Sequence, residues 1–219
     1  MSRAFGPNEF LFLVEALRWT VLLTIVAFIG GGIGGFIVAL ARVSPSRPAR
    51  MLAWVFTMLL QGTPLLMQLF VAFYGLAVLT GLRLDAWPAV ALAFTLYAAA
   101  FLGDIWRGTI DAIPKTQWEA ATALGMRRWA TLRTIVLPQA ARIAIPPTVG
   151  FLVQLIKNTS VAAIVGFVEL TRAGQLMVNV TFQPMIVYPI VAALYFAICW
   201  PISLAASRLE HRLDRRHAR

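Results

Sequence analysis

Long apolar stretches, separated by shorter polar segments, run along the whole chain. A helix needs about 20 apolar residues to cross the hydrocarbon core of a bilayer, and five stretches approach or exceed that length. We expect membrane-spanning helices over residues 14–40, 51–79, 87–105, 145–168 and 185–206. The pattern therefore predicts an all-α integral membrane protein with about five transmembrane helices, built as a single transmembrane domain over residues 1–219.

Composition supports a membrane protein, and the distribution of charge predicts how the chain is oriented in the membrane. Apolar residues make up 60% of the chain and charged residues only 13%, which excludes an ordinary soluble domain. Basic residues favour the cytoplasmic side of a membrane, and here they gather after the first and third spans and in the tail over 207–219. We therefore expect the N-terminus outside and the C-terminus inside. The residues behind this assignment are Arg42, Arg47 and Arg50, then Arg107, Lys115, Arg127, Arg128, Arg133 and Arg142, and finally Arg208, Arg212, Arg215, Arg216 and Arg219, against Arg3, Arg83 and Arg172 on the other side.

The net charge of +10 does not point to nucleic acid. A basic excess confined to one side of an apolar chain is explained by topology and by attraction to anionic lipid. We expect no nucleic-acid partner.

The polar segment between the third and fourth spans, at about 107–145, predicts a short exposed helix. Pro114 stops the preceding structure, Thr116 and Glu119 have the spacing of a capping box, and Gly125 can adopt the left-handed conformation that ends a helix. Small residues along it, Ala120, Ala121 and Ala123, would allow close approach to the groove of another protein. The alternative is a solvated loop helix without a partner.

The same segment resembles the signature of the permease subunits of ABC importers. Glu-Ala-Ala is followed after three residues by Gly, after nine more by Ile, and after one more by Leu-Pro, and every position is present: Glu119, Ala120, Ala121, Gly125, Ile135, Leu137 and Pro138. Three further blocks resemble the polar amino acid branch, the histidine, glutamine and glutamate type: 61–66, 107–114, and 157–160 together with 168–172.

The resemblance implies a type I importer permease of the bacterial inner membrane, with 107–145 as its cytoplasmic coupling loop. In that family the short helix sits in a cleft of a separate ATPase, so Glu119, Ala120, Ala121, Gly125, Leu137 and Pro138 are the expected coupling residues. The implied partners are ABC ATPase subunits, a second permease chain in a homodimer or heterodimer, an extracytoplasmic solute-binding protein, and an amino acid substrate. ATP and Mg would be held by the ATPase.

This chain itself is expected to bind no cofactor or metal and to catalyse no reaction. Its two lysines, Lys115 and Lys157, lack the glycine-rich loop that cradles phosphate. Cys199 stands alone in the last span, and His211 and His217 lie six residues apart in the tail. These spacings offer neither a disulfide nor a metal site.

Two polar segments within spans are candidates for the substrate path. Gln61, Gly62, Thr63 and Pro64 interrupt the second span, and an interrupted helix is tolerated in a membrane where it is packed in protein or lines a cavity. The alternative is a simple proline kink. The resemblance agrees with the path, because the matching segment of amino acid permeases lies along the translocation route.

Lys157, Asn158, Thr159 and Ser160 form the second candidate segment, in the fourth span. Polar side chains at membrane depth indicate a wetted cavity, although a snorkelling lysine beside capping residues would give the same pattern. The amino acid permeases that the chain resembles commonly read Lys-Asp-Thr-Ser here. Since Asn158 replaces the acid, we expect an acidic or neutral polar substrate rather than a cationic one.

Other features favour packing. Gly30 with Gly34, and Gly31 with Gly35, form two small-xxx-small pairs that suit either packing within the chain or a subunit interface. Glu15 with Arg18, and Asp104 with Arg107, are each three residues apart and can form ion pairs on one helix face.

Two other classes of protein share part of this pattern. An ion-gradient-driven secondary transporter would also have a broken helix and intramembrane charge, but it has no need of a small-residue helix on the cytoplasmic face. A membrane-embedded enzyme would need an activated nucleophile, and Ser160 has no histidine or second buried acid near it in sequence.

Overall fold

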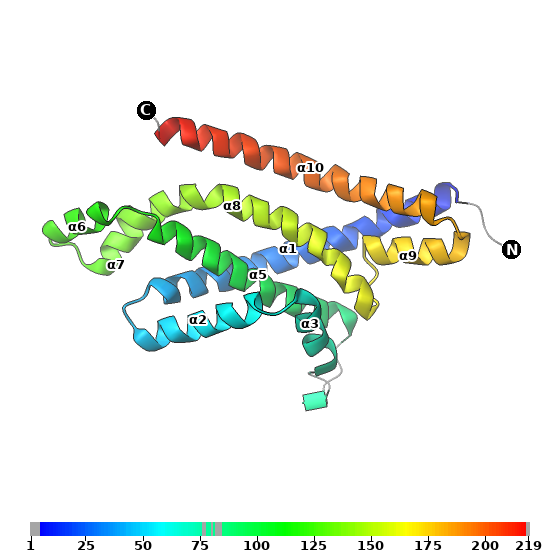
Figure 1. Ribbon diagram of the computed structural model, residues 1–219, viewed down its shortest axis with the longest axis horizontal. Helices are drawn as coiled ribbons and strands as arrows, with labels where there is room; N and C mark the ends of the chain where they lie inside the picture. The colour runs from blue at the N-terminus through cyan, green and yellow to red at the C-terminus, as the bar shows by residue number, and fades with distance from the viewer. Residues whose placement is uncertain (1–4, 76–77, 80, 82–84, 218–219) are drawn as a thin grey trace.

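The computed structural model describes residues 5–75, 78–79, 81 and 85–217, with side chains as far as Glu210. The regular elements of this part of the chain are all helical (Figure 1), so the all-α prediction is confirmed. They are α1 (Pro7–Val43), α2 (Arg47–Gln61), α3 (Leu65–Phe70), the π-helical η1 (Val71–Gly75), α5 (Ala86–Asp111), α6 (Lys115–Ala123), α7 (Arg128–Thr131), the π-helical η2 (Leu132–Val136), α8 (Leu137–Asn158), the 3-10 helix η3 (Thr159–Val165), α9 (Leu170–Thr181) and α10 (Pro184–His217).

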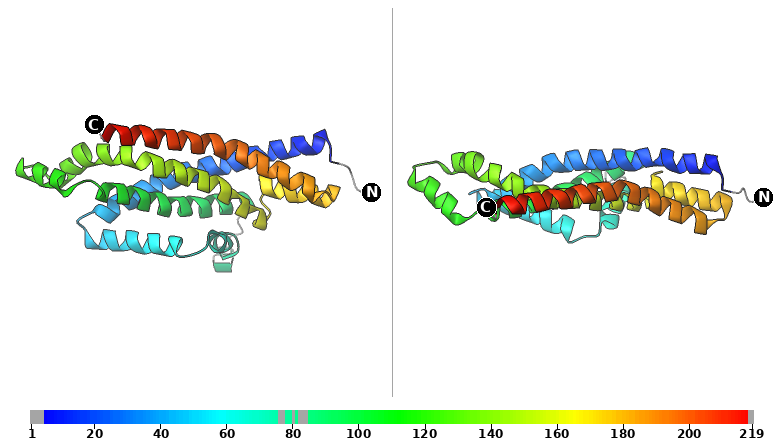
Figure 2. Two further views of the ribbon diagram at one scale, coloured as in Figure 1. Left: turned by 45° about the horizontal axis from the view of Figure 1, so that its top comes forward. Right: turned by 90° about the horizontal axis from the view of Figure 1, so that it is seen from above.

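The long helices run roughly along one axis of an elongated bundle (Figures 1 and 2). Four helical stretches are long and apolar enough to cross a membrane, and α2 with α3 and η1 gives a fifth if the bent pair counts as one span. The expected five spans therefore each have a counterpart. Helix α1 starts at one end of the bundle, and α10 ends at the other, which is also the end where α6 and α7 lie (Figure 2).

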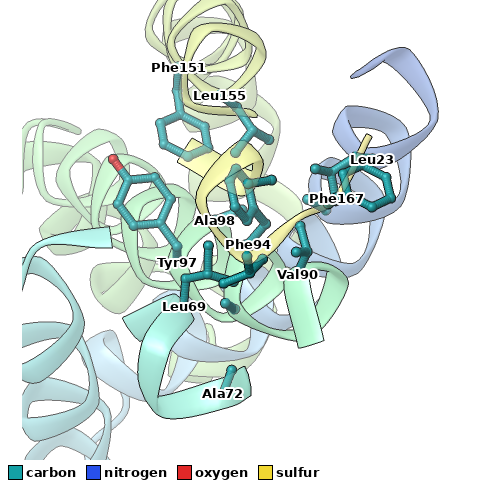
Figure 3. Packing of buried hydrophobic residues seen from close by; sticks show 14 of the residues in the cluster. Leu23, Leu69, Ala72, Val90, Phe94, Tyr97, Ala98, Phe151, Leu155 and Phe167 are labelled. Carbon is teal, nitrogen blue, oxygen red and sulfur yellow. The ribbon is translucent and has the colours of Figure 1, made fainter. Parts of the chain in front are cut away.

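Helix α5 lies at the centre of the main core (Figure 3). Val90, Phe94 and Leu102 of α5 are fully buried and belong to one cluster with Leu23 of α1 and Leu155 of α8. Large side chains from α1, α8 and, through Leu69, α3 thus pack against one helix. This packing fixes α5 as the element that other helices are positioned against.

The glycines of α1 allow it to lie close to α5. A Cβ atom built on Gly31 would lie 2.3 Å from the Cβ of Ala98, and one on Gly35 would lie 2.9 Å from the backbone N of Gly103. Gly30 and Gly34 also face α5 side chains at 2.9 Å. All four glycines therefore serve helix packing within the chain, which decides between the two alternatives.

Three local features differ from the sequence-based expectation. The second span is not one kinked helix, because α2 and the α3–η1 stretch meet at 102°. A twelve-residue helix, α9, follows the fourth span and was not anticipated, since it is too short to cross a bilayer. Helix α10 continues through the basic tail as far as His217 instead of ending with the apolar residues.

Candidate functional site

Helix α6 projects at one end of the bundle and is held by turns on both sides (Figure 1). Gly125 has φ +72°, which confirms the left-handed residue expected after this helix, and its N–H donates to the carbonyl of Thr122 at 2.9 Å. The expected capping box is wrong. The N-cap is Pro114, and Thr116 lies inside the first turn, because the proline ends the preceding segment two residues before the threonine.

One face of α6 is free and the other is packed. Glu119, Ala120 and Ala123 are exposed, whereas Ala121 is only 1% exposed. The expectation that Ala121 lies on the exposed face with its neighbours is therefore wrong. At α-helical spacing, Ala121 turns towards the protein while Ala120 turns away.

A small apolar cluster fixes the loop that carries α6. Ile110, Ile113, Leu132 and Val136 are buried together, and Leu137 packs against them. Pro138 follows at the junction where the π-helical η2 continues directly into α8. Leu137 thus belongs to the packed base of the loop, whereas Pro138 beside it is exposed.

Two contacts of Arg128 tie this loop to the end of α1. Its guanidinium lies 5.6 Å from the centre of the Trp118 ring on α6, and it donates to the carbonyl of Val43 at 3.2 Å. A hollow of about 1000 Å³ lies beside α6, with Trp118 and Glu119 on one wall and Arg42 on another. The exposed face of α6 and this hollow form a continuous, charged surface suited to a protein partner.

The break after α2 is stabilised by a residue that the sequence analysis missed. Pro64 has no N–H to donate to the carbonyl of Leu60, and the side-chain amide of Gln68 donates to that carbonyl instead, at 2.6 Å. Gln68 also donates to the carbonyl of Thr63 at 3.0 Å. The break is therefore a built feature, with its freed carbonyls satisfied from one turn further along the chain.

The segment 61–64 lies exposed at the bend. Gln61 donates to the carbonyl of Ala100 on α5 at 3.4 Å, and the hydroxyl of Thr63 donates back to the carbonyl of Leu59 at 2.8 Å. Gly62 and Pro64 are exposed as well. The polar groups of this segment are therefore available on the surface of the single chain.

The four residues 157–160 do not share one surface. Lys157 is exposed, whereas Thr159 is fully buried and donates to the carbonyl of Ile156 at 2.7 Å. Ser160 is half-buried and donates to the carbonyl of Lys157 at 2.8 Å. Lys157 is therefore the exposed member of this segment, whereas Asn158 and Ser160 are both half-buried.

Asn158 uses both ends of its amide. Its Nδ2 donates to the hydroxyl of Tyr97 at 3.2 Å, and its Oδ1 accepts from Gln154 at 3.2 Å. Tyr97 and Ala100, the α5 partners of Asn158 and Gln61, lie one helical turn apart. The structure thus brings the two candidate segments to neighbouring positions on α5.

The family model for "binding-protein-dependent transport system inner membrane component" matches residues 31–219. The chain belongs to this family. It is an inner membrane permease component, a class of transport subunit that is not itself an enzyme.

Relatives of this permease include the L-cystine transport system permease protein TcyB of Bacillus subtilis (strain 168), which is 40% identical over 91% of this chain and 85% of its own length. The glutamine transport system permease protein GlnP of Escherichia coli (strain K12) is 31% identical over 92% of each chain. A solved amino acid ABC transporter "with histidines" matches with a TM-score of 0.86 at 30% identity, covering 92% of this chain and 94% of its own. The resemblance to amino acid ABC permeases and the type I importer fold are confirmed.

A buried acid of the permease was also missed as a candidate. Glu169 is fully buried and caps α9, where it accepts from the N–H groups of Thr171 and Arg172 at 2.9 and 2.8 Å. The hydroxyl of Tyr195 on α10 donates to the same carboxyl at 2.8 Å. No clear signal was present in the sequence, because Glu is not among the preferred N-cap residues. The network joins α9 to α10.

No group of three metal-binding side chains occurs among the residues that the structure describes. The ion pairs expected on α1 and α5 are present: Glu15 with Arg18 at 2.9 Å and Asp104 with Arg107 at 3.1 Å. Arg107 also pairs with Asp111 at 2.7 Å, in the last turn of α5.

Proposed function

We propose that this permease moves an amino acid across the membrane, driven by a separate ATPase that docks on α6. The observation that carries the proposal is α6 itself, a short helix exposed on one face, packed on the other and ended by the left-handed Gly125. Because one face of α6 is packed against the protein, a movement that a partner imposes on α6 can be transmitted to the helices that follow it. The coupling residues are Glu119, Ala120, Ala121, Gly125, Leu137 and Pro138.

The coupling residues fall into two groups with different tasks. Glu119 and Ala120 face outward and would contact the ATPase, while Ala121 and Leu137 face the protein and would carry the motion into α8. ATP can shift the transporter only by favouring one of its global states over the other. ATP and Mg would act on the ATPase, and this chain would supply the moving helix.

A complete importer needs more than this chain. Two permease chains, as a homodimer or a heterodimer, two ATPase subunits and an extracytoplasmic solute-binding protein form the proposed complex. The family description, binding-protein-dependent transport, supports a binding-protein partner. The proposed orientation has the N-terminus outside and the basic C-terminus inside, and α6 lies at the same end of the bundle as the end of α10 (Figure 2).

The proposed substrate is an acidic or neutral polar amino acid. Asn158 and Gln61 offer uncharged amides to the candidate path, and Lys157 offers a positive charge with no ion pair to it among the described residues. A cationic side chain would find no carboxylate at this position. L-cystine and glutamine, which the names of two relatives give as transported molecules, are both free of net positive charge at neutral pH.

The coupling proposal is tested with Glu119→Lys and Gly125→Pro in the full complex in proteoliposomes. Proline cannot adopt the φ of Gly125, and lysine reverses the charge of the exposed face, so both should abolish ATP-driven uptake while leaving the chain inserted. Glu210→Lys, the same change at an exposed site of α10, is the control and should transport normally. Retained uptake with either loop variant would refute the coupling role, and uptake without ATP driven by an ion gradient would favour a secondary transporter.

The substrate proposal is tested with Asn158→Asp. Uptake of labelled glutamine is measured in competition with glutamate, arginine and lysine. The wild type should be inhibited by glutamate and not by the cationic amino acids, and the variant should gain inhibition by arginine. A wild type that prefers arginine would overturn the proposed class without affecting the coupling result.

A further inference from the structure

A cavity lined by arginines lies at the corner where α1 turns into α2, beside the last turns of α5. Its volume is about 410 Å³. Four arginines and a single acid contribute to its wall, together with an aromatic residue: Arg42, Arg47, Arg50, Arg107, Asp111 and Trp54. The cavity is separate from the break of the second span and from the residues 157–160.

Most of the positive charge in this cavity is not neutralised by the protein. Arg107 is paired with Asp104 and Asp111, but within the described part of the chain Arg42, Arg47 and Arg50 have no ion pair. Arg50 donates only to the neutral carbonyls of Ser44 and Pro45, at 2.8 and 3.2 Å. Three guanidinium groups that repel one another around a hollow form a site for an anion with several oxygen atoms.

The position of the cavity selects the kind of anion. Trp54 lies one turn beyond Arg50 on α2 and is 44% exposed, as expected of a residue at the membrane interface. Beyond it the outward face of α2 is apolar, with Met58 and Leu59 about 60% exposed. The charged hollow therefore opens at the level of lipid headgroups, directly above a surface for acyl chains.

We propose that the phosphate of an anionic phospholipid, such as phosphatidylglycerol, binds between Arg42, Arg47 and Arg50, with its acyl chains along α2. Basic pockets between helices at the cytoplasmic face are suited to such headgroups. The lipid would fasten the α1–α2 corner to the end of α5, because Arg107 contributes to the cavity and also holds Asp111. The segment that leads into α6 would then be steadied by the lipid.

The test measures lipid bound to the purified complex by native mass spectrometry, without ATP or substrate. The complex is titrated with phosphatidylglycerol or phosphatidylcholine, and the wild type should retain phosphatidylglycerol preferentially. The triple variant Arg42→Gln/Arg47→Gln/Arg50→Gln should weaken phosphatidylglycerol binding at least about tenfold, since each basic residue contributes roughly 1 kcal/mol near an anionic lipid. The control, Arg133→Gln/Arg142→Gln/Arg208→Gln, removes three exposed arginines outside the cavity and should bind like the wild type.

Several results would overturn the proposal. One is equal retention of the two lipids by the wild type, and another is an equal loss in the control. Displacement of the lipid by millimolar inorganic phosphate would mean a free-anion site, and loss of the ATPase or of a second permease chain from the triple variant would mean a protein interface. If the triple variant does not fold, Arg47→Gln alone, at an exposed position, should still weaken phosphatidylglycerol binding by about fivefold.

Discussion

Replacing Gly31 by alanine tests how closely α1 must approach α5. The new Cβ would lie 2.3 Å from the Cβ of Ala98 and 3.0 to 3.1 Å from the backbone of Ala98 and Ala99. Neither an alanine methyl group nor a helix backbone can rotate away. The two helices would have to separate by about 1 Å to restore ordinary contact near 3.4 Å.

The expected loss of stability follows from the weakened contacts along the separated helices. A gap of 0.5 to 1 Å forfeits roughly a quarter to a half of the dispersion energy of each contact, and overpacked cores lose about 1–3 kcal/mol. We expect Gly31→Ala to lower the free energy of unfolding by about 2–3 kcal/mol, at the upper end of this range. For a chain of this length that corresponds to a fall in Tm of roughly 5–10 °C.

The neighbouring residue provides a matched control. A Cβ on Gly32 would lie 3.7 Å from the Trp106 ring, which is ordinary contact. Alanine is the better helix former by about 1 kcal/mol, so Gly32→Ala should leave Tm unchanged or raise it slightly. Both variants are heated in detergent, and the fraction that stays monodisperse is followed by size-exclusion chromatography. Equal stability of the two variants would refute the close α1–α5 contact.

Two further substitutions test the region around α9. Glu169→Ala removes the acceptor for two backbone N–H groups and for the hydroxyl of Tyr195, and should lower the free energy of unfolding by about 3 kcal/mol. Glu169→Gln keeps one acceptor oxygen and should lower it by less. Equal losses in the two variants would contradict the hydrogen-bonded role of Glu169. Gly166→Ala should lower the free energy of unfolding by roughly 1–2 kcal/mol, because Gly166 has φ +82°. Gly150→Ala, in a helix with open space around the glycine, is the control and should not lower it. A Gly166→Ala variant as stable as the wild type would argue against the left-handed turn.

The features that the sequence predicted are those set by local physics. Apolar length alone locates the spans, because a bilayer requires about 20 apolar residues whatever they pack against. Pro114 and Gly125 bound α6 through their own backbone restrictions, which neighbouring helices do not change. Close glycine pairs on α1 were also visible, although the sequence could not name α5 as their partner.

The features that the sequence could not predict depend on contacts between distant segments. Ala120 and Ala121 are the same residue type in adjacent positions, and only the packing of the loop makes one exposed and the other 1% exposed. Glu169 is not a typical N-cap residue, and its bond to Tyr195 joins residues 26 positions apart. Helix α9 escaped notice because a twelve-residue helix carries no membrane-span signal.

The geometry of the broken second span depends both on a local signal, the proline, and on a contact made by a residue further along the chain. A proline in an apolar run predicts a freed carbonyl, but it does not say whether the helix kinks or turns sharply. Here the Gln68 amide donates to the carbonyl that Pro64 leaves without its usual donor, and the chain turns by 102°. Satisfying that carbonyl removes the main penalty of a broken backbone in hydrocarbon. The bend can therefore persist in the membrane and hold Gln61 against α5, one helical turn from the tyrosine that contacts Asn158.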